Sequence, residues 1–196
     1  EIRLSLVGSE MCIRDRNSRI AKENIEYEKK MNEYYLKCFL LEFSKICIFF
    51  IFFSLLGLIP EYLIALLSLM LLRSNGGGLH YKHYISCLAV SFLFLCGSIT
   101  LATYITPPTI LACFTSLLCS LIGYWLVPIT SSNRPPATVE QAKKSKRNTM
   151  FIILEFIILI CICPHNTYIF IGYWTIILHI FQLVIARILK EVKKIV

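Results

Sequence analysis

Residues 84–106 read YISCLAVSFLFLCGSITLATYIT and contain no charged side chain. A helix needs about 20 apolar residues to cross the hydrocarbon core of a membrane, so this stretch is long enough to span it. Five further apolar stretches lie at roughly 36–59, 61–72, 108–127, 150–163 and 167–188. They are continuous blocks and lack the strict alternation of a membrane β-strand. The pattern predicts an all-α fold, a polytopic helical membrane protein.

The overall composition indicates the same class. Of the 196 residues, 57% are hydrophobic and only 16% are charged, and the mean hydropathy is +0.68. An average soluble domain is about 45–50% apolar and about 25% charged. An ordinary soluble domain is therefore excluded. We expect a multi-pass membrane protein that is in contact with lipids and has no nucleic-acid partner.

The number of spans depends on two short stretches, residues 61–72 and 150–163, because length alone leaves four to six spans. The positions of Lys and Arg decide between these counts. The connections after the first, third and fifth stretches contain no Lys or Arg, whereas the other connections and both flanks are basic. The basic residues are Lys22, Lys29, Lys30, Lys37, Arg73, Lys82, Arg134, Lys143, Lys144, Lys146, Arg147, Arg187, Lys190, Lys193 and Lys194. Six spans place all of them on one side, which the positive-inside rule assigns to the cytoplasm. We expect about six helices with both termini cytoplasmic.

Two segments precede the predicted spans, and one long loop lies between them. Residues 1–16 look like a translated sequencing adapter, and we expect them to be an artefact that is no part of the fold. Residues 17–35 form a polar cytoplasmic N-terminal segment. Residues 36–196 form one membrane-embedded domain, in which 128–149 is a cytoplasmic loop whose second half is able to start a helix.

The side chains best suited to catalysis lie close together in the sequence, in residues 73–80, RSNGGGLH, and at Cys87. Polar groups at membrane depth are costly and usually functional, and a Cys with a nearby His is the minimum equipment for a thiolate nucleophile. His83 precedes Cys87 by four positions, so helical geometry favours it as the base. His80 is a candidate as well, because the glycines allow the backbone to leave helical dihedrals. The spacing of His80, His83 and Cys87 also permits a zinc site. A further alternative is that both histidines only line a cytoplasmic interface and have no catalytic role.

This motif resembles the signature of the accessory gene regulator protein B (AgrB) family, membrane cysteine endopeptidases that mature quorum-sensing peptides. The resemblance extends to residues 41–42, 58–61 and 133–135, and length and hydropathy match from about residue 30 to the end. One departure is Asn75-Gly76, where members commonly carry an aromatic residue and an alanine.

The resemblance implies that Cys87 is the nucleophile and His80 its base, with support from Arg73, Gly77 and Gly78. His83 is then a bystander. The implied substrate is an AgrD-like precursor peptide, which is cleaved through an acyl-thioester and cyclised to a thiolactone or lactone autoinducer. No metal or other cofactor is implied, and the family suggests a homodimer. We add that backbone N–H groups of residues 76–78 are candidate oxyanion donors.

Other assignments are weaker. Glu42 is the best candidate for a third catalytic residue, although an ion pair with Lys45 explains it equally well. A basic segment is a candidate site for the acidic tail of the precursor, or for anionic lipid. Its residues are Lys143, Lys144, Lys146 and Arg147. Most of the nine cysteines lie in apolar stretches and act as small hydrophobic residues. The alternative to a peptidase is a small transporter or a non-catalytic assembly protein that uses the glycine-rich break for binding.

Overall fold

The computed structural model describes residues 28–29, 31–33, 35–37, 39–77, 84–128, 138–164 and 166–195, with side chains described to residue 189. The predictions for residues 1–16, for much of 17–35 and for Gly78, His80 and His83 lie outside the described residues.

The described residues confirm the all-α prediction. An N-terminal helix covers Met31–Leu55. It is followed by α2 (Ile59–Gly76), α3 (Tyr84–Tyr104), α4 (Thr109–Leu126), α5 (Val139–Ile162) and α6 (Thr167–Ile195). Four of these six helices are long and apolar enough to cross a membrane, namely the N-terminal helix, α3, α4 and α6. The other two, α2 and α5, contain the two short apolar stretches.

Polar turns lengthen both of these helices beyond their apolar residues. α2 is 18 residues long and includes Glu61 in its first turn and Arg73 in its last. α5 has 24 residues, so residues 139–149 of the expected loop are the first half of a helix. At 1.5 Å per residue, 18 residues are about 27 Å long, close to the thickness of a bilayer core.

Local sequence signals explain where these helices begin. Gly57 adopts a positive φ of 70° after the N-terminal helix, and the Leu58 N–H donates to the Phe53 carbonyl at 2.9 Å. Pro60 then lies in the first turn of α2, where its missing N–H has no helical partner to lose. α5 starts with a capping box in which Thr138 and Gln141 exchange side-chain and backbone hydrogen bonds.

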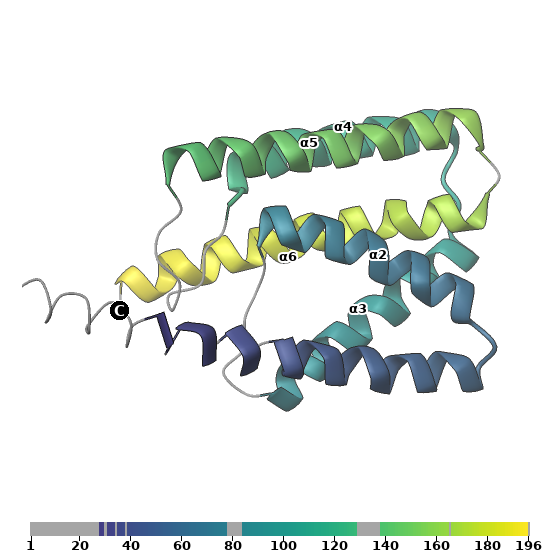
Figure 1. Ribbon diagram of the computed structural model, residues 1–196. Coiled ribbons are helices and arrows are strands. Elements are labelled where there is room, and N and C mark those ends of the chain that lie inside the picture. The colour runs from purple at the N-terminus through teal and green to yellow at the C-terminus, as the bar shows by residue number, and fades with distance from the viewer. Residues whose placement is uncertain are drawn as a thin grey trace, which may run out of the picture. The chain divides into compact units, whose positions relative to one another are not determined.

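The chain divides into two compact units, residues 1–48 and 49–196. In the second unit, α6 packs against each of the helices α2, α3, α4 and α5, and α4 lies alongside α5 (Figure 1). This explains why α6 is the most buried of the four candidate spans. Its buried side chains include Phe170, Ile176 and Leu183.

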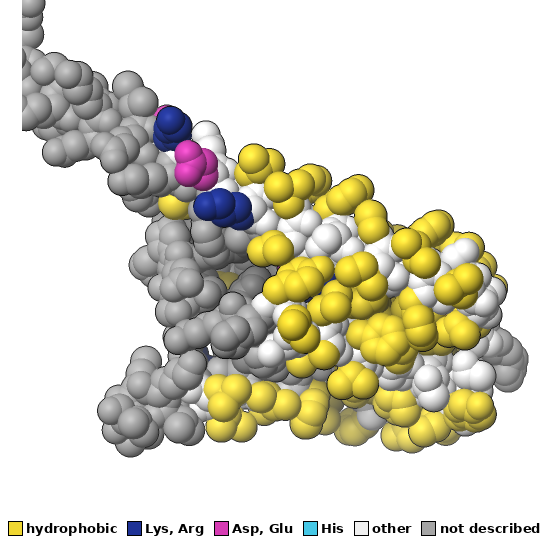
Figure 2. Space-filling model, turned by 90° about the horizontal axis from the view of Figure 1, so that it is seen from below, with side chains coloured by type: hydrophobic (Ala, Val, Ile, Leu, Met, Phe, Trp, Pro, Cys, Tyr) yellow, Lys and Arg dark blue, Asp and Glu magenta, His cyan; other side chains and the backbone are white. Residues whose placement is uncertain are grey.

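The core of the second unit consists of two hydrophobic clusters. One cluster surrounds Phe53, whose ring stacks on Tyr62 at a centroid distance of 5.0 Å. The other contains Leu72 of α2, Val127 after α4 and Ile153 of α5, packed around α6. Outside these clusters, large apolar side chains are exposed over much of the chain, and Figure 2 shows them spread across one face. Exposed apolar surface of this extent is expected where the solvent is lipid.

Polar contacts between helices tie specific ends together. At one end, Trp174 of α6 donates from Nε1 to the carbonyl of Ile105 after α3 at 2.9 Å. Near that end, the Thr115 hydroxyl bonds to the Tyr173 hydroxyl at 2.9 Å. At the other end, Asn148 of α5 donates to the side-chain oxygen of Asn75 in α2 at 3.1 Å. The end of α2 and the first half of α5 therefore lie together.

The pairing of α4 with α5 is testable through two thiols. Cys113 of α4 and Cys161 of α5 have their sulfur atoms 3.5 Å apart. We expect mild oxidation of the protein in membranes to link them, and mass spectrometry of the digested protein to detect the joined peptides. Cys163→Ser should keep this link and Cys161→Ser should lose it, because Cys163 lies two positions further, beyond the end of α5. Linkage of Cys113 to Cys163 instead would contradict the packing described here.

Candidate functional site

The described residues of the glycine-rich motif are helical as far as Gly76. Arg73, Ser74, Asn75 and Gly76 form the last turn of α2, and Gly77 is its C-cap. Gly77 has φ 79° and ψ −155°, a backbone conformation that is essentially restricted to glycine. The departure from helical dihedrals that the sequence allowed therefore begins at Gly77 and not at Gly76.

The backbone N–H of Gly77 donates to the carbonyl of Arg73 at 3.1 Å. Two of the three glycines thus lie in or directly at the end of a hydrogen-bonded helix. An oxyanion role for the Gly77 N–H, which the sequence had suggested, is not available in this conformation, because its hydrogen is already donated.

Cys87 lies near the N-terminal side of α3, and its side chain is half-buried. Residues 78–83, between Gly77 and α3, lie outside the described residues. α2 and α3 are in contact.

Buried polar groups gather where the end of α2 meets α6. His179 and Gln182 of α6 are 0% and 6% exposed. Both ring nitrogens of His179, both amide atoms of Gln182 and the Nε of Arg73 have no hydrogen-bond partner in the part of the chain that the structure describes. Arg73, expected to support Cys87, lies one turn before Gly76, and the imidazole of His179 lies against Gly76. The end of α2 that contains Arg73 therefore packs on this histidine of α6.

Sequence reasoning missed His179. The signal that identifies it is an ionisable residue in the middle of the apolar stretch 167–188, away from Arg187 at its end, and such a residue by default indicates function in a membrane protein. Gln182 follows His179 by three positions, so both side chains lie on one face of α6.

The four basic residues expected to bind substrate lie together on the first half of α5. They line a surface pocket of about 550 Å³, together with Tyr124 of α4, Glu140 and Met150. The Lys146 ammonium lies 5.0 Å from the centroid of the Tyr124 ring, a cation–π distance. The pocket combines positive charge with an aromatic wall.

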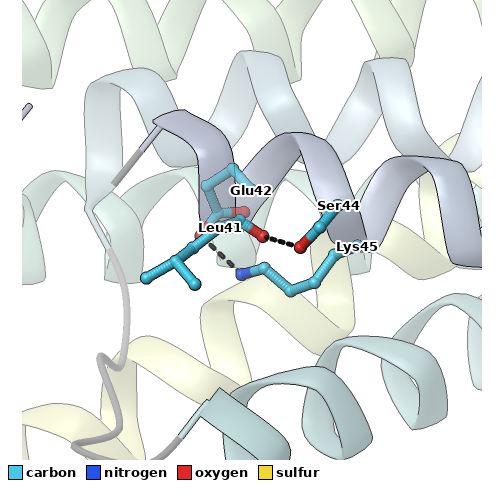
Figure 3. A network of polar contacts seen from close by, with 4 residues as sticks. All are labelled: Leu41, Glu42, Ser44 and Lys45. Carbon is cyan, nitrogen blue, oxygen red and sulfur yellow. Dashed lines mark hydrogen bonds and ion pairs between the residues drawn. The ribbon is translucent and has the colours of Figure 1, made fainter. Parts of the chain in front are cut away.

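Glu42 lies in the unit formed by residues 1–48 and pairs with Lys45 one helical turn away (Figure 3). The Ser44 hydroxyl donates to the carbonyl of Leu41 at 2.9 Å in the same turn. The ion pair is the alternative that the sequence had left open for Glu42. Among the described residues, no three His, Cys, Asp or Glu side chains are grouped to hold a metal ion, and the zinc alternative involves His80 and His83, which lie outside them.

Comparison with known proteins adds one decisive finding. The model of the family described as Accessory gene regulator B matches residues 15–183. The chain belongs to the AgrB family. The match contains the whole of α2 to α5 and the motif from Arg73 to Cys87. Membership of the AgrB family implies a role as an AgrD-processing peptidase in quorum sensing. No curated protein and no solved structure matches the chain.

The conformation of Gly77 leads to a prediction about stability. Gly77→Ala places a side chain where φ is 79°, and we expect it to lower the free energy of unfolding by about 1–3 kcal/mol. The measurement is unfolding of the purified protein in detergent. Gly97→Ala in α3 is the matched control, because its Cβ would lie 3.7 Å from Leu178, an ordinary contact. Equal stability of the two variants would contradict the backbone assignment.

Proposed function

We propose that this chain is a membrane cysteine endopeptidase that cleaves an AgrD-like precursor peptide and promotes its cyclisation. The observation that carries the proposal is the family match, since it covers the entire Arg73–Cys87 motif. The half-buried side chain of Cys87 supports it, because a nucleophilic cysteine has to be partly accessible to its substrate.

The reaction has two acyl transfers. The Cys87 thiolate attacks a peptide carbonyl of the precursor, and His80 gives the proton it holds to the departing amine, so the C-terminal tail leaves. The remaining precursor is bound to Cys87 as a thioester. A thiol or hydroxyl within the precursor then attacks this thioester while the neutral His80 takes its proton. A thiolactone or lactone ring closes, and Cys87 leaves as the thiolate beside the protonated His80. Arg73, Gly77 and Gly78 support the pair by fixing the end of α2 and the start of the connection.

We further propose six membrane spans, with both termini and the catalytic connection in the cytoplasm of a bacterial cell. The grouping of helix ends supports this topology. The ends of α2 and α4 and the first half of α5 meet at Gly76, Val127 and Asn148. The connections of the second unit that contain Lys and Arg start or end there. An excess of Lys and Arg in the connections on one side is typical of the cytoplasmic side. A precursor made in the cytosol then reaches the site without crossing the membrane.

The basic pocket of α5 is proposed to hold the acidic tail of the precursor. The four cations lie within two turns of one helix, so several carboxylates of one peptide are able to engage them together. Glu42 receives no catalytic role in this proposal, because its carboxylate is held by Lys45. The homodimer that the family suggests stays a proposal about assembly.

Co-expression with a precursor tests the catalytic assignment. We expect Cys87→Ala and His80→Ala to abolish processing and His83→Ala to retain it, with the released tail and the cyclic product measured by mass spectrometry. Undiminished processing by Cys87→Ala would indicate the transporter or assembly alternative. Loss of activity with His83→Ala, but not with His80→Ala, would assign the base to His83.

Charge reversal tests the basic pocket. Lys143→Glu with Lys144→Glu should raise the KM for an acidic precursor about tenfold, because two attractive contacts become repulsive. A precursor with a lysine-containing tail should partly recover this loss. The assay uses vesicles of neutral and of anionic lipid, since a basic residue near an anionic membrane contributes about 1 kcal/mol to attraction. An effect that depends on the lipid but not on the tail would assign the segment to lipid binding.

A further inference from the structure

The contact between His179 and Gly76 links α6 to the end of α2. A Cβ atom built on Gly76 would lie 3.0 Å from Nε2 of His179, 3.5 Å from Val127 and 3.6 Å from Leu183. The last two distances are ordinary contacts. The imidazole alone occupies the space that a side chain at position 76 would need, and it is fully buried.

This contact gives a physical reason for glycine at position 76. Gly76 is helical, and alanine is the better helix former at a helical position. Helix propensity therefore does not favour glycine at this position. The ring of His179 does favour it, because a Cβ at position 76 would lie 3.0 Å from Nε2 and would push the ring away by a few tenths of an ångström.

We propose that His179 is a positioning residue that fixes the end of α2, and through it the connection that carries His80. The inference rests on the proposed function and deepens it. An imidazole packed on a glycine backbone holds the last turn of α2 in one place, and Gly77 then directs the chain out of the helix. His179 acts on this turn and not on the reacting atoms.

The surrounding residues support a positional role. Arg73 lies one turn before Gly76 in α2, and Gln182 lies one turn after His179 in α6. The rest of the contact between these helices includes apolar side chains such as Leu72, Leu183 and Ile176. Apolar surfaces of similar shape allow small shifts along a helix, whereas a ring seated on a glycine is specific for one register.

A double-mutant cycle tests the proposal. The variants are Gly76→Ala, His179→Ala and the double variant, with Gly97→Ala as the matched control and Cys87→Ala as the inactive reference. The readouts are kcat and KM for a precursor peptide in vesicles, together with the midpoint of thermal unfolding. We expect Gly76→Ala to lower kcat about tenfold with KM nearly unchanged, as overpacking that displaces the catalytic segment would do.

In the double variant the smaller side chain at position 179 makes room for the Cβ at position 76. We therefore expect its kcat to exceed the product of the two single effects by about tenfold. Gly97→Ala should keep the kcat of the wild type. If the two effects multiply, or if only the unfolding midpoint falls while kcat is retained, His179 is an ordinary core residue and the proposal fails.

Two further measurements, an alkylation rate and the activity of Cys87→Ala, complete the test. If Gly76→Ala does not assemble in the membrane, the rate at which iodoacetamide alkylates Cys87 in His179→Ala replaces the cycle. We expect this rate to change at least about threefold because the base is displaced, and an unchanged rate overturns the proposal. Activity of Cys87→Ala would instead overturn the proposed function itself, so the two failures are distinguishable.

Discussion

Packing against α6 is the interaction on which the second unit of this chain depends. α2, α3, α4 and α5 all contact α6, and both hydrophobic clusters include its side chains. Lipid does not drive apolar helices together as water does, so close packing and polar contacts between helices carry the association. Small buried residues on α4, such as Ser116 and Gly123, let that helix approach closely. The Cβ that Gly123 lacks would lie only 3.1 Å from Ile180 of α6.

The same helix brings the polar side chains of Thr175, His179 and Gln182 into the interior. The Thr175 hydroxyl donates to the Ile171 carbonyl, whereas His179 and Gln182 have no partner among the described residues. Buried polar groups without partners are costly, so their presence indicates a use. His179 lies against Gly76 in the last turn of α2, which belongs to the glycine-rich motif. The structural centre of the second unit and its candidate functional site are therefore adjacent.

Much of this architecture follows from the sequence, because apolar length and turn residues act locally. The all-α fold and the ion pair of Glu42 with Lys45 were both predictable from the sequence. The second half of the segment 128–149 was expected to be able to start a helix, and α5 begins at Val139. The capping box of Thr138 and Gln141 is the local signal that fixes where this helix starts.

The site was less predictable, because it depends on contacts between distant parts of the chain. From the sequence, Gly76 was a position at which the backbone could leave the helix, whereas the structure places it inside α2 with the ring of His179 close to where a Cβ would lie. Nothing local connects positions 76 and 179, because helix packing and not motif spacing decides which face of α2 is buried against α6.

The hydrogen bond from Asn148 to Asn75 has a mechanical consequence. α5 contains neither glycine nor proline from Val139 to Ile162, so it has no point at which it would bend easily. Its basic first half is therefore stiff up to Asn148, which follows Arg147 directly. Asn148 is hydrogen-bonded to Asn75 in the last turn of α2, so the basic pocket and the glycine-rich motif are joined by one stiff helix and one hydrogen bond. A shift of the first half of α5 along its axis would therefore strain the contact at Asn75.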